Sequence, residues 1–276
     1  MEEVLITAER NGAASSKYSN DKDEKIIGLE FDIFDKPVNI QVGVSSEKTS
    51  LADIVPLAWS ISAKITELTV EKICEEGGEV PCRLGCSSCC GYLVPVSVPE
   101  AFWITERILE MPEGQRFMLQ RCLPAAKRIL SQRPPKFLTE QSRDILSTGE
   151  AERNKVANWY RQLKVQCPFE YRKSCAIYGL RPLACREHFV KGSARGCREE
   201  RGTAEVIEMP VRMLNVLGQL ASELESKDVE TVMMPLIPAW YEKNKQRGER
   251  KYPAAAMVER LGEILRATTE STVFSF

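Results

Sequence analysis

Eight of the ten cysteines lie in two short segments, and this distribution constrains the chain more than any other feature. The segments are rich in Gly, Ser, Pro and Arg rather than in apolar residues. Cysteines that serve as small core residues would instead stand singly on apolar faces, as we expect for Cys74 and Cys122. The clustered residues are Cys82, Cys86, Cys89 and Cys90 in the first segment, and Cys167, Cys175, Cys185 and Cys197 in the second.

The N-terminal sequence bears on the oxidation state of these thiols. It begins MEEVLITAERNGAASS, which is acidic and has no apolar run before a small-residue cleavage site, so it does not read as a signal peptide. We therefore expect a cytoplasmic protein, in a compartment where persistent disulfides are rare. Metal ligation or redox chemistry then explains the cysteines better than a disulfide framework or scattered core thiols.

Overall composition excludes some other classes of function. The 276 residues are 43% hydrophobic and 28% charged, which is ordinary for a globular protein. A formal net charge of −1 gives no reason to predict nucleic-acid binding. No apolar run reaches the roughly 20 residues of a membrane-spanning helix, so we predict no membrane association.

The hydrophobic pattern predicts a mainly α protein with a small N-terminal β-hairpin and two irregular metal-binding cysteine loops. Residues 26–34 and 38–44 alternate with period 2 around Asp35-Lys36-Pro37, which predicts the hairpin. Ser50 is an expected N-cap for a helix that carries Cys74 and ends at Gly77-Gly78. Ser97 and Glu100 form a capping box for the next helix. Further helices are expected over 115–130 with a break or kink at Pro124, and over 140–146, 150–165, 210–226, 237–245 and 254–267.

These elements suggest a division into four regions. Residues 1–25 are polar and are expected to be a mobile N-terminus, and residues 26–80 form the hairpin plus a helix. Residues 81–202 would be a cysteine-cluster metal-binding domain. Residues 203–276 would be C-terminal helices, either a separate module or packed on the same core.

The spacing of the cysteines bears on which metal they would bind. The first segment reads C-x3-C-x2-C-C, and the gaps in the second are x7, x9 and x11. Structural zinc sites usually pair two C-x2–4-C knuckles, and the second segment has none. Irregular thiolate ligation with a proline after Cys167 favours an iron–sulfur cluster, expected to be 4Fe-4S, over zinc. Eight cysteines exceed one four-ligand site, so two centres or one centre with spare thiols remain open.

Several residues together resemble a known family. The run CRLGCSSCC, then GYLVPVSVPEA, CPF and CAIYGLRPLACR, resembles the zinc- or iron-chelating CxxCxxCC (YkgJ-like) family over about residues 81–197. The most specific part is C-x-I-Y-x-x-R-P-x-x-C-R, from Cys175 to Arg186. The family name has two residues between its first two cysteines, whereas three residues lie between Cys82 and Cys86. The resemblance implies a cysteine-bound metal centre, and some relatives resemble flagellin lysine methylases.

Other residues near the second segment could assist a metal. His188, the sole histidine, could be a ligand, a proton donor or simply a packed loop residue. Phe169 and Tyr178 are expected to shield the site from water rather than to act chemically. A group of arginines could offset thiolate charge, hold an anionic substrate or cofactor, or form a solvated basic loop. These arginines are Arg181, Arg186, Arg195, Arg198 and Arg201.

The leading functional prediction is a redox or structural metal module that acts with an unidentified protein partner. The alternative is a metal-dependent protein-modifying enzyme, with a protein substrate, that resembles the flagellin lysine methylases. A radical S-adenosylmethionine enzyme is disfavoured, although C-x3-C-x2-C matches its ligand spacing. Ser88 stands where that motif carries an aromatic residue, and no repeated strand–helix pattern follows.

Overall fold

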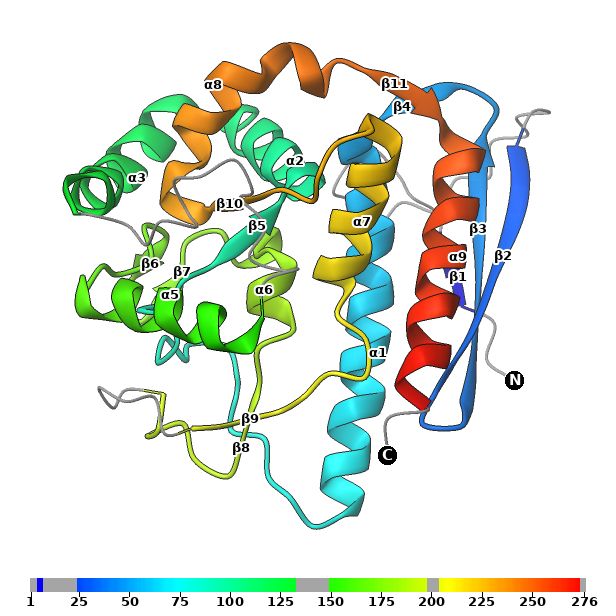
Figure 1. Cartoon of the computed structure of the whole chain (residues 1–276), viewed down its shortest axis with the longest axis horizontal. Helices are drawn as coiled ribbons and strands as arrows, with labels where there is room; N and C mark the ends of the chain where they lie inside the picture. Colours follow the sequence, from blue (N-terminus) through cyan, green and yellow to red (C-terminus); the bar gives the residue numbers. More distant parts are fainter. Residues whose placement is uncertain (1–3, 7–23, 133–148, 198–203, 274–276) are drawn as a thin grey trace.

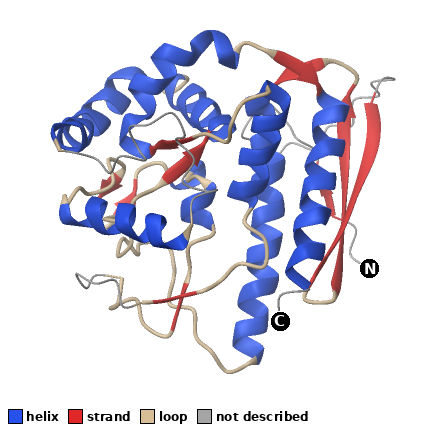
Figure 2. Cartoon of the chain, viewed as in Figure 1, coloured by secondary structure: helices blue, strands red, loops and turns tan. Residues whose placement is uncertain are grey.

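The computed structural model describes residues 4–6, 24–132, 149–197 and 204–273, and these residues form a mainly helical fold (Figure 2). One large hydrophobic cluster draws buried side chains from Ile27 near the beginning of the described chain to Leu265 near its end. The hairpin, the second cysteine segment and the C-terminal helices all contribute to it. No helix among the described residues is long and apolar enough to cross a membrane.

The predicted hairpin is confirmed as strands β2 (Glu24–Ile33) and β3 (Lys36–Ser45). Ile27, Leu29 and Ile33 alternate with exposed residues and face the core. The turn lies earlier in the sequence than the predicted Asp35-Lys36-Pro37. It is formed by Phe34 and Asp35, with φ of 53° and 59°, and Pro37 already lies in β3. Two successive residues with a left-handed backbone conformation suit a two-residue hairpin turn, because the twist of such a turn matches the right-handed twist of the strands.

The third strand of this sheet comes from the N-terminal region that was predicted to be mobile. Strand β1 (Val4–Ile6) pairs in parallel with β3, so β3 lies in the middle of the sheet. Figure 1 shows this ribbon at one side of the molecule, against helix α9 (Ala254–Val273). The sheet is therefore covered on one side by a helix from the opposite end of the chain.

Helix α1 (Val55–Glu75) is the long central element. It follows strand β4 (Lys48–Ser50) and the 3₁₀ turn η1 (Leu51–Ile54), where the Asp53 carboxylate accepts hydrogen bonds from Ser50 N at 3.0 Å and Ser50 Oγ at 2.7 Å. This reciprocal cap confirms the expected helix start. Ile61 and Ile65 on the buried face are fully covered, whereas Cys74 is exposed on the last turn, so its prediction as a packed residue is wrong.

Helix α2 (Val98–Leu109) begins after strand β5 (Pro95–Ser97), at the predicted capping box. Strand β10 (Thr231–Met233) pairs with β5, and β11 (Lys251–Pro253) pairs with β4. Helix α3 (Gly114–Ser131) continues through Pro124, so a break at this residue, one of the two predicted alternatives, is wrong. Helix α5 (Glu150–Gln162) agrees with the pattern, and the predicted helix over 140–146 lies outside the described residues.

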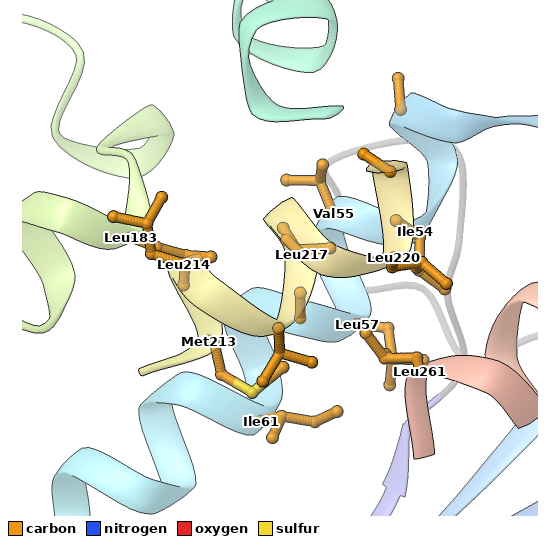
Figure 3. Close-up of a cluster of buried hydrophobic side chains, with 14 of the residues drawn as sticks. Ile54, Val55, Leu57, Ile61, Leu183, Met213, Leu214, Leu217, Leu220 and Leu261 are labelled. Atoms are coloured by element: carbon orange, nitrogen blue, oxygen red, sulfur yellow. The ribbon is translucent and has the colours of Figure 1, made fainter. Parts of the chain in front are cut away.

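The three C-terminal helices complete the core. Helix α7 (Met213–Glu225) packs between α1 and α9. Figure 3 shows Leu217 and Leu220 of α7 in one cluster of buried side chains with Leu57 of α1 and Leu261 of α9. Turn η3 (Met234–Leu236) leads into α8 (Ile237–Gly248), which packs on α2. Inside this region the Arg247 guanidinium forms a buried, two-pronged ion pair with Glu225, with N–O distances of 2.6 and 2.5 Å. Burial of apolar area at these contacts supplies the main favourable free energy of folding.

Candidate metal centre

The first cysteine segment is a series of tight turns between α1 and β5. Backbone hydrogen bonds join Cys86 N to Arg83 O at 3.0 Å, Cys90 N to Ser87 O at 3.1 Å and Tyr92 N to Cys89 O at 3.0 Å. Gly85 has a φ of 85°, a left-handed conformation that a side chain would disfavour. These turns fold the short segment that carries the four cysteines back on itself.

The second segment is built from small elements around the first. Strands β6 (Glu170–Tyr171) and β7 (Ser174–Cys175) form a hairpin that carries Cys175. Turn η2 (Tyr178–Leu180) leads into the one-turn helix α6 (Leu183–Arg186), which carries Cys185. Strand β8 (Val190–Lys191) pairs with β9 (Glu205–Val206) before and after Cys197. The second segment therefore depends on local hairpins rather than on long helices.

Direct backbone contacts join the two segments. Cys167 N donates to Cys90 O at 2.7 Å, and Gly192 N donates to Glu79 O at 2.8 Å. The backbone N–H of Val190 also donates to the Cys82 thiol, which lowers the pKa of Cys82 against the larger effect of burial. Residues that lie far apart in the sequence are thus neighbours in the fold.

All eight predicted cysteines belong to one connected network of thiols. Cys89 is the shared neighbour. At Cys90 the largest cause of the raised pKa is the hydrogen bond with Cys89. Burial is the largest cause of the raised pKa of Cys82, Cys167, Cys185 and Cys197, and the charge of Cys89 raises each of them further. Cys86 acts likewise on Cys82 and Cys197, and Cys175 acts on Cys167 and Cys185. The structure therefore brings the two predicted clusters together in one place.

Most of these thiols favour the protonated form. Burial is the largest cause of the raised pKa of Cys167, to about 11, and of the raised pKa of Cys185. The adjacent pair behaves differently: the Cys90 thiol donates a hydrogen bond to Cys89, which lowers the pKa of Cys89 and raises that of Cys90. Because metals bind thiolates, binding here would release protons, and affinity would fall as the pH is lowered.

The thiols are close, but they do not yet form a coordination sphere. Among the described residues, no group of three or more Cys, His, Asp or Glu side chains is arranged to hold a metal ion. The metal centre therefore stays a prediction.

The charged surroundings of the thiols agree with an anionic occupant. Arg181 lowers the pKa of Cys89, Cys175 and Cys185 through its positive charge, although these are the smaller causes at each thiol. Its Nε is buried and has no hydrogen-bond partner in the described structure. A thiolate-bound metal or cluster would place acceptors and negative charge at this guanidinium. The donor set and this unpaired N–H are thus compatible with a metal centre.

The other predicted neighbours have varied environments. Arg186 donates to Arg181 O and Gly179 O at 2.6 Å each and lies over the Trp59 ring, so it braces the loop that carries Cys185. Phe169 is fully buried, whereas Tyr178 is 39% exposed and lies beneath the Arg181 guanidinium, and the shielding role of both residues stays a prediction. Arg195 is exposed, and Arg198 and Arg201 lie outside the described residues.

His188 lies at the edge of the network. Its ring meets Tyr92 edge-on with centroids 5.6 Å apart, and its Nε2 is buried without a partner in the described structure. Burial lowers the pKa of His188, and the charge of Arg212 lowers it further. A neutral imidazole with one unpaired nitrogen is able to ligate a metal, and this role stays a prediction.

Two buried carboxyl groups hold helix α6 in place: Glu100, predicted only as a helix cap, and Glu187, which the sequence did not single out. Glu100 Oε1 accepts from Leu183 N at 2.7 Å, and Glu187 Oε1 accepts from Met213 N at 2.8 Å and Ser62 Oγ at 3.1 Å. Figure 3 shows Leu183 from α6 packed beside Leu214 from α7. Cys185 thus belongs to a short helix that is fixed to α1, α2 and α7.

The buried Glu187 leads to a pH-dependent prediction. Burial raises the pKa of Glu187 from its ordinary value of 4.5 to about 8, and the nearby Glu100 adds to the shift. Between pH 4.5 and about pH 8 the carboxyl is ionised in the unfolded chain but protonated in the folded chain. The ionisation of Glu187 therefore makes the folded protein less stable as the pH rises through this range. Relative to the unsubstituted protein, Glu187→Gln should therefore become more stable by roughly 3 kcal/mol between pH 5 and pH 8.

Denaturant unfolding at both pH values checks this prediction. The exposed Glu208→Gln is the matched control, and its difference from the unsubstituted protein should not change with pH. If Glu187→Gln destabilised the protein more at pH 8 than at pH 5, the carboxyl would be bound as an anion, contrary to this account.

Comparisons of the chain with protein-family models, curated proteins and solved structures found no match. The resemblance to the CxxCxxCC (YkgJ-like) family thus depends on the quoted residues alone and stays a prediction. The functional argument rests on the arrangement of the eight cysteines and the residues around them.

Proposed function

We propose that this chain holds a cysteine-bound metal centre, an iron–sulfur cluster rather than zinc, and acts as a redox or structural metal module in the cytoplasm. The observation that supports this most is that Cys89 neighbours thiols of both distant segments, namely Cys82, Cys90, Cys167, Cys185 and Cys197. Cytoplasmic disulfides are rare, so such a gathering of thiols favours metal. All ten cysteines are free in the structure, which agrees with a reduced state.

The preference for iron–sulfur rests on the ligand set. Irregular gaps and a proline directly after Cys167 suit cluster ligation better than paired zinc knuckles. The positive charge of Arg181 beside three of the thiols would offset the charge of a thiolate-bound cluster and tune its potential. A 4Fe-4S cluster would use four of the eight cysteines.

A redox role and a purely structural role give different results on reduction. We expect anaerobically purified protein to gain an electron paramagnetic resonance signal when dithionite is added, and to lose it again on mild oxidation. A centre that carries iron but bleaches irreversibly, or a colourless zinc protein, would contradict the redox role. The unchanged chain is used, since the thiol network draws on residues from Cys82 to Cys197.

A second candidate function is supported by a cavity of about 960 Å³ beside the thiols, lined in part by Cys197. Enzymes need a concave pocket next to the reacting centre, whereas a closed structural site does not. This favours the alternative of a metal-dependent protein-modifying enzyme, which resembles the flagellin lysine methylases in its cysteine motif. Its partner would then be a protein substrate.

A further inference from the structure

The cavity of about 960 Å³ lies between the first cysteine segment and the end of helix α5. Ser87, Gly91 and Tyr92 line it on the side of the cysteine loop, and Cys197 lines it beside them. Its volume is at the upper end of the range of small-molecule sites, roughly 300–1,000 Å³. The thiol network therefore adjoins a space large enough for a small organic molecule.

The charged side chains at this cavity are mostly basic. Arg161, Lys164 and Lys173 line it, against the single acidic side chain of Glu170 among the described residues. The Glu170 carboxylate accepts a hydrogen bond from Lys173 N at 2.7 Å, so it is partly satisfied by the turn of the β6–β7 hairpin. Within the described parts of the chain, no ion pair joins the ammonium group of Lys164 or Lys173 to a carboxylate. The two lysines thus bring positive charge to the cavity that no ion pair within the described residues balances.

The inner side of the cavity connects this charge to the thiols. The Tyr92 hydroxyl donates to the Cys197 thiol, and the Arg161 guanidinium lies 5.2 Å from the centre of the Tyr92 ring. The Cys197 thiol in turn neighbours Cys89, Cys82 and Cys86. A molecule held by the basic side chains would therefore lie against the Cys197 side of the network.

We propose that this cavity binds a small molecule that carries a carboxylate or phosphate group and holds it beside the proposed metal centre, a placement that rests on the proposed function. Arg161, Lys164 and Lys173 supply the attraction for the anionic group, because opposite charges at a partly enclosed surface attract strongly. Amide side chains of Gln162 and Gln166 add hydrogen-bonding groups at the same walls. Binding should weaken as the salt concentration rises, since part of each lysine is exposed to solvent.

Calorimetric titration with citrate and with inorganic pyrophosphate tests this inference on the full chain. Citrate is a carboxylate probe and pyrophosphate a phosphate probe. The probe that binds with the higher affinity shows which anionic group the cavity prefers. We expect at least one to bind, and the Lys164→Glu/Lys173→Glu variant to bind it at least about tenfold more weakly. The Lys164→Gln/Lys173→Gln variant, which removes charge without reversing it, should weaken binding less.

The matched control reverses two exposed lysines elsewhere, Lys227→Glu/Lys243→Glu, and changes the net charge equally. It should alter the affinity less than twofold. The inference would be overturned if neither probe bound. It would also be overturned if Lys164→Glu/Lys173→Glu and the control Lys227→Glu/Lys243→Glu weakened binding equally.

Metal content of the same samples separates this inference from the proposed function. Protein that contains metal but binds neither probe would overturn the anion site alone. Charge-dependent binding by protein that lacks metal would support the anion site and overturn the metal centre.

Discussion

Cys185→Ser is expected to remove the metal almost completely, with a stoichiometry below about a tenth of that of the unsubstituted protein. The Cys185 thiol neighbours Cys167, Cys89 and Cys175, and it is carried by a helix that the core holds in place. Serine keeps the shape but is a far weaker ligand for iron or zinc than a thiolate. Because metal-binding free energy contributes to folding, the variant should also unfold at lower denaturant concentration. Metal analysis and visible absorbance of anaerobically purified protein measure the effect.

The two cysteines that were not predicted as ligands serve as controls. Cys74 is exposed at the end of α1, so Cys74→Ser should keep both metal and stability. Cys122 is 1% exposed and lies near Cys167, so Cys122→Ala, which adds no buried hydroxyl, should keep the metal with a small loss of stability. Loss of metal in the Cys74 variant, or its retention in Cys185→Ser, would show that the assigned ligands are wrong.

Glu100→Ala is expected to destabilise the fold by about 4 kcal/mol. The carboxylate is fully buried and accepts hydrogen bonds from Trp59 Nε1 at 2.9 Å, Leu183 N at 2.7 Å and Ser97 Oγ at 2.9 Å. Alanine would leave these donors unsatisfied, remove the cap of α2 and open a cavity. Since the bond to Leu183 fixes the start of the helix that carries Cys185, the variant should also retain less metal.

Chemical denaturation of three variants separates these contributions. Glu100→Gln keeps the acceptor for Trp59 and Leu183 but not that for Ser97, so it should cost less than alanine. Glu110→Ala removes only a surface pair with Arg107 and should cost about 0.5 kcal/mol or less. Equal stability of Glu100→Ala and Glu110→Ala would contradict the proposed role of the buried carboxylate.

The parts of the fold that the sequence predicted are governed by local interactions. The capping pairs Ser50–Asp53 and Ser97–Glu100 satisfy N–H groups within one turn, so the helix starts could be located from neighbouring residues. The alternation of apolar residues likewise predicted the β2–β3 hairpin. The prediction failed where local propensity competes with long-range packing: α3 continues through Pro124, and β3 already includes Pro37.

The cysteine site shows the same division between local and long-range information. Clustering predicted which thiols would gather, because spare core cysteines do not collect in polar loops. It could not predict that Cys89 joins the two segments, that Tyr178 is exposed, or that Glu100 and Glu187 hold the Cys185 helix. These depend on contacts between residues far apart in the sequence. The cavity beside Cys197 was also missed, since its basic residues are scattered from Arg161 to Lys173.

Iron, zinc and acid-labile sulfide per chain, measured on anaerobically purified protein, test the central claim most directly. The account predicts a brown protein with iron and sulfide in similar amounts, about four of each if one 4Fe-4S cluster is bound. Zinc in whole-number stoichiometry without sulfide would keep the cysteine-bound metal but reverse its assignment. Metal-free, folded protein whose thiols all titrate as free groups would contradict the account.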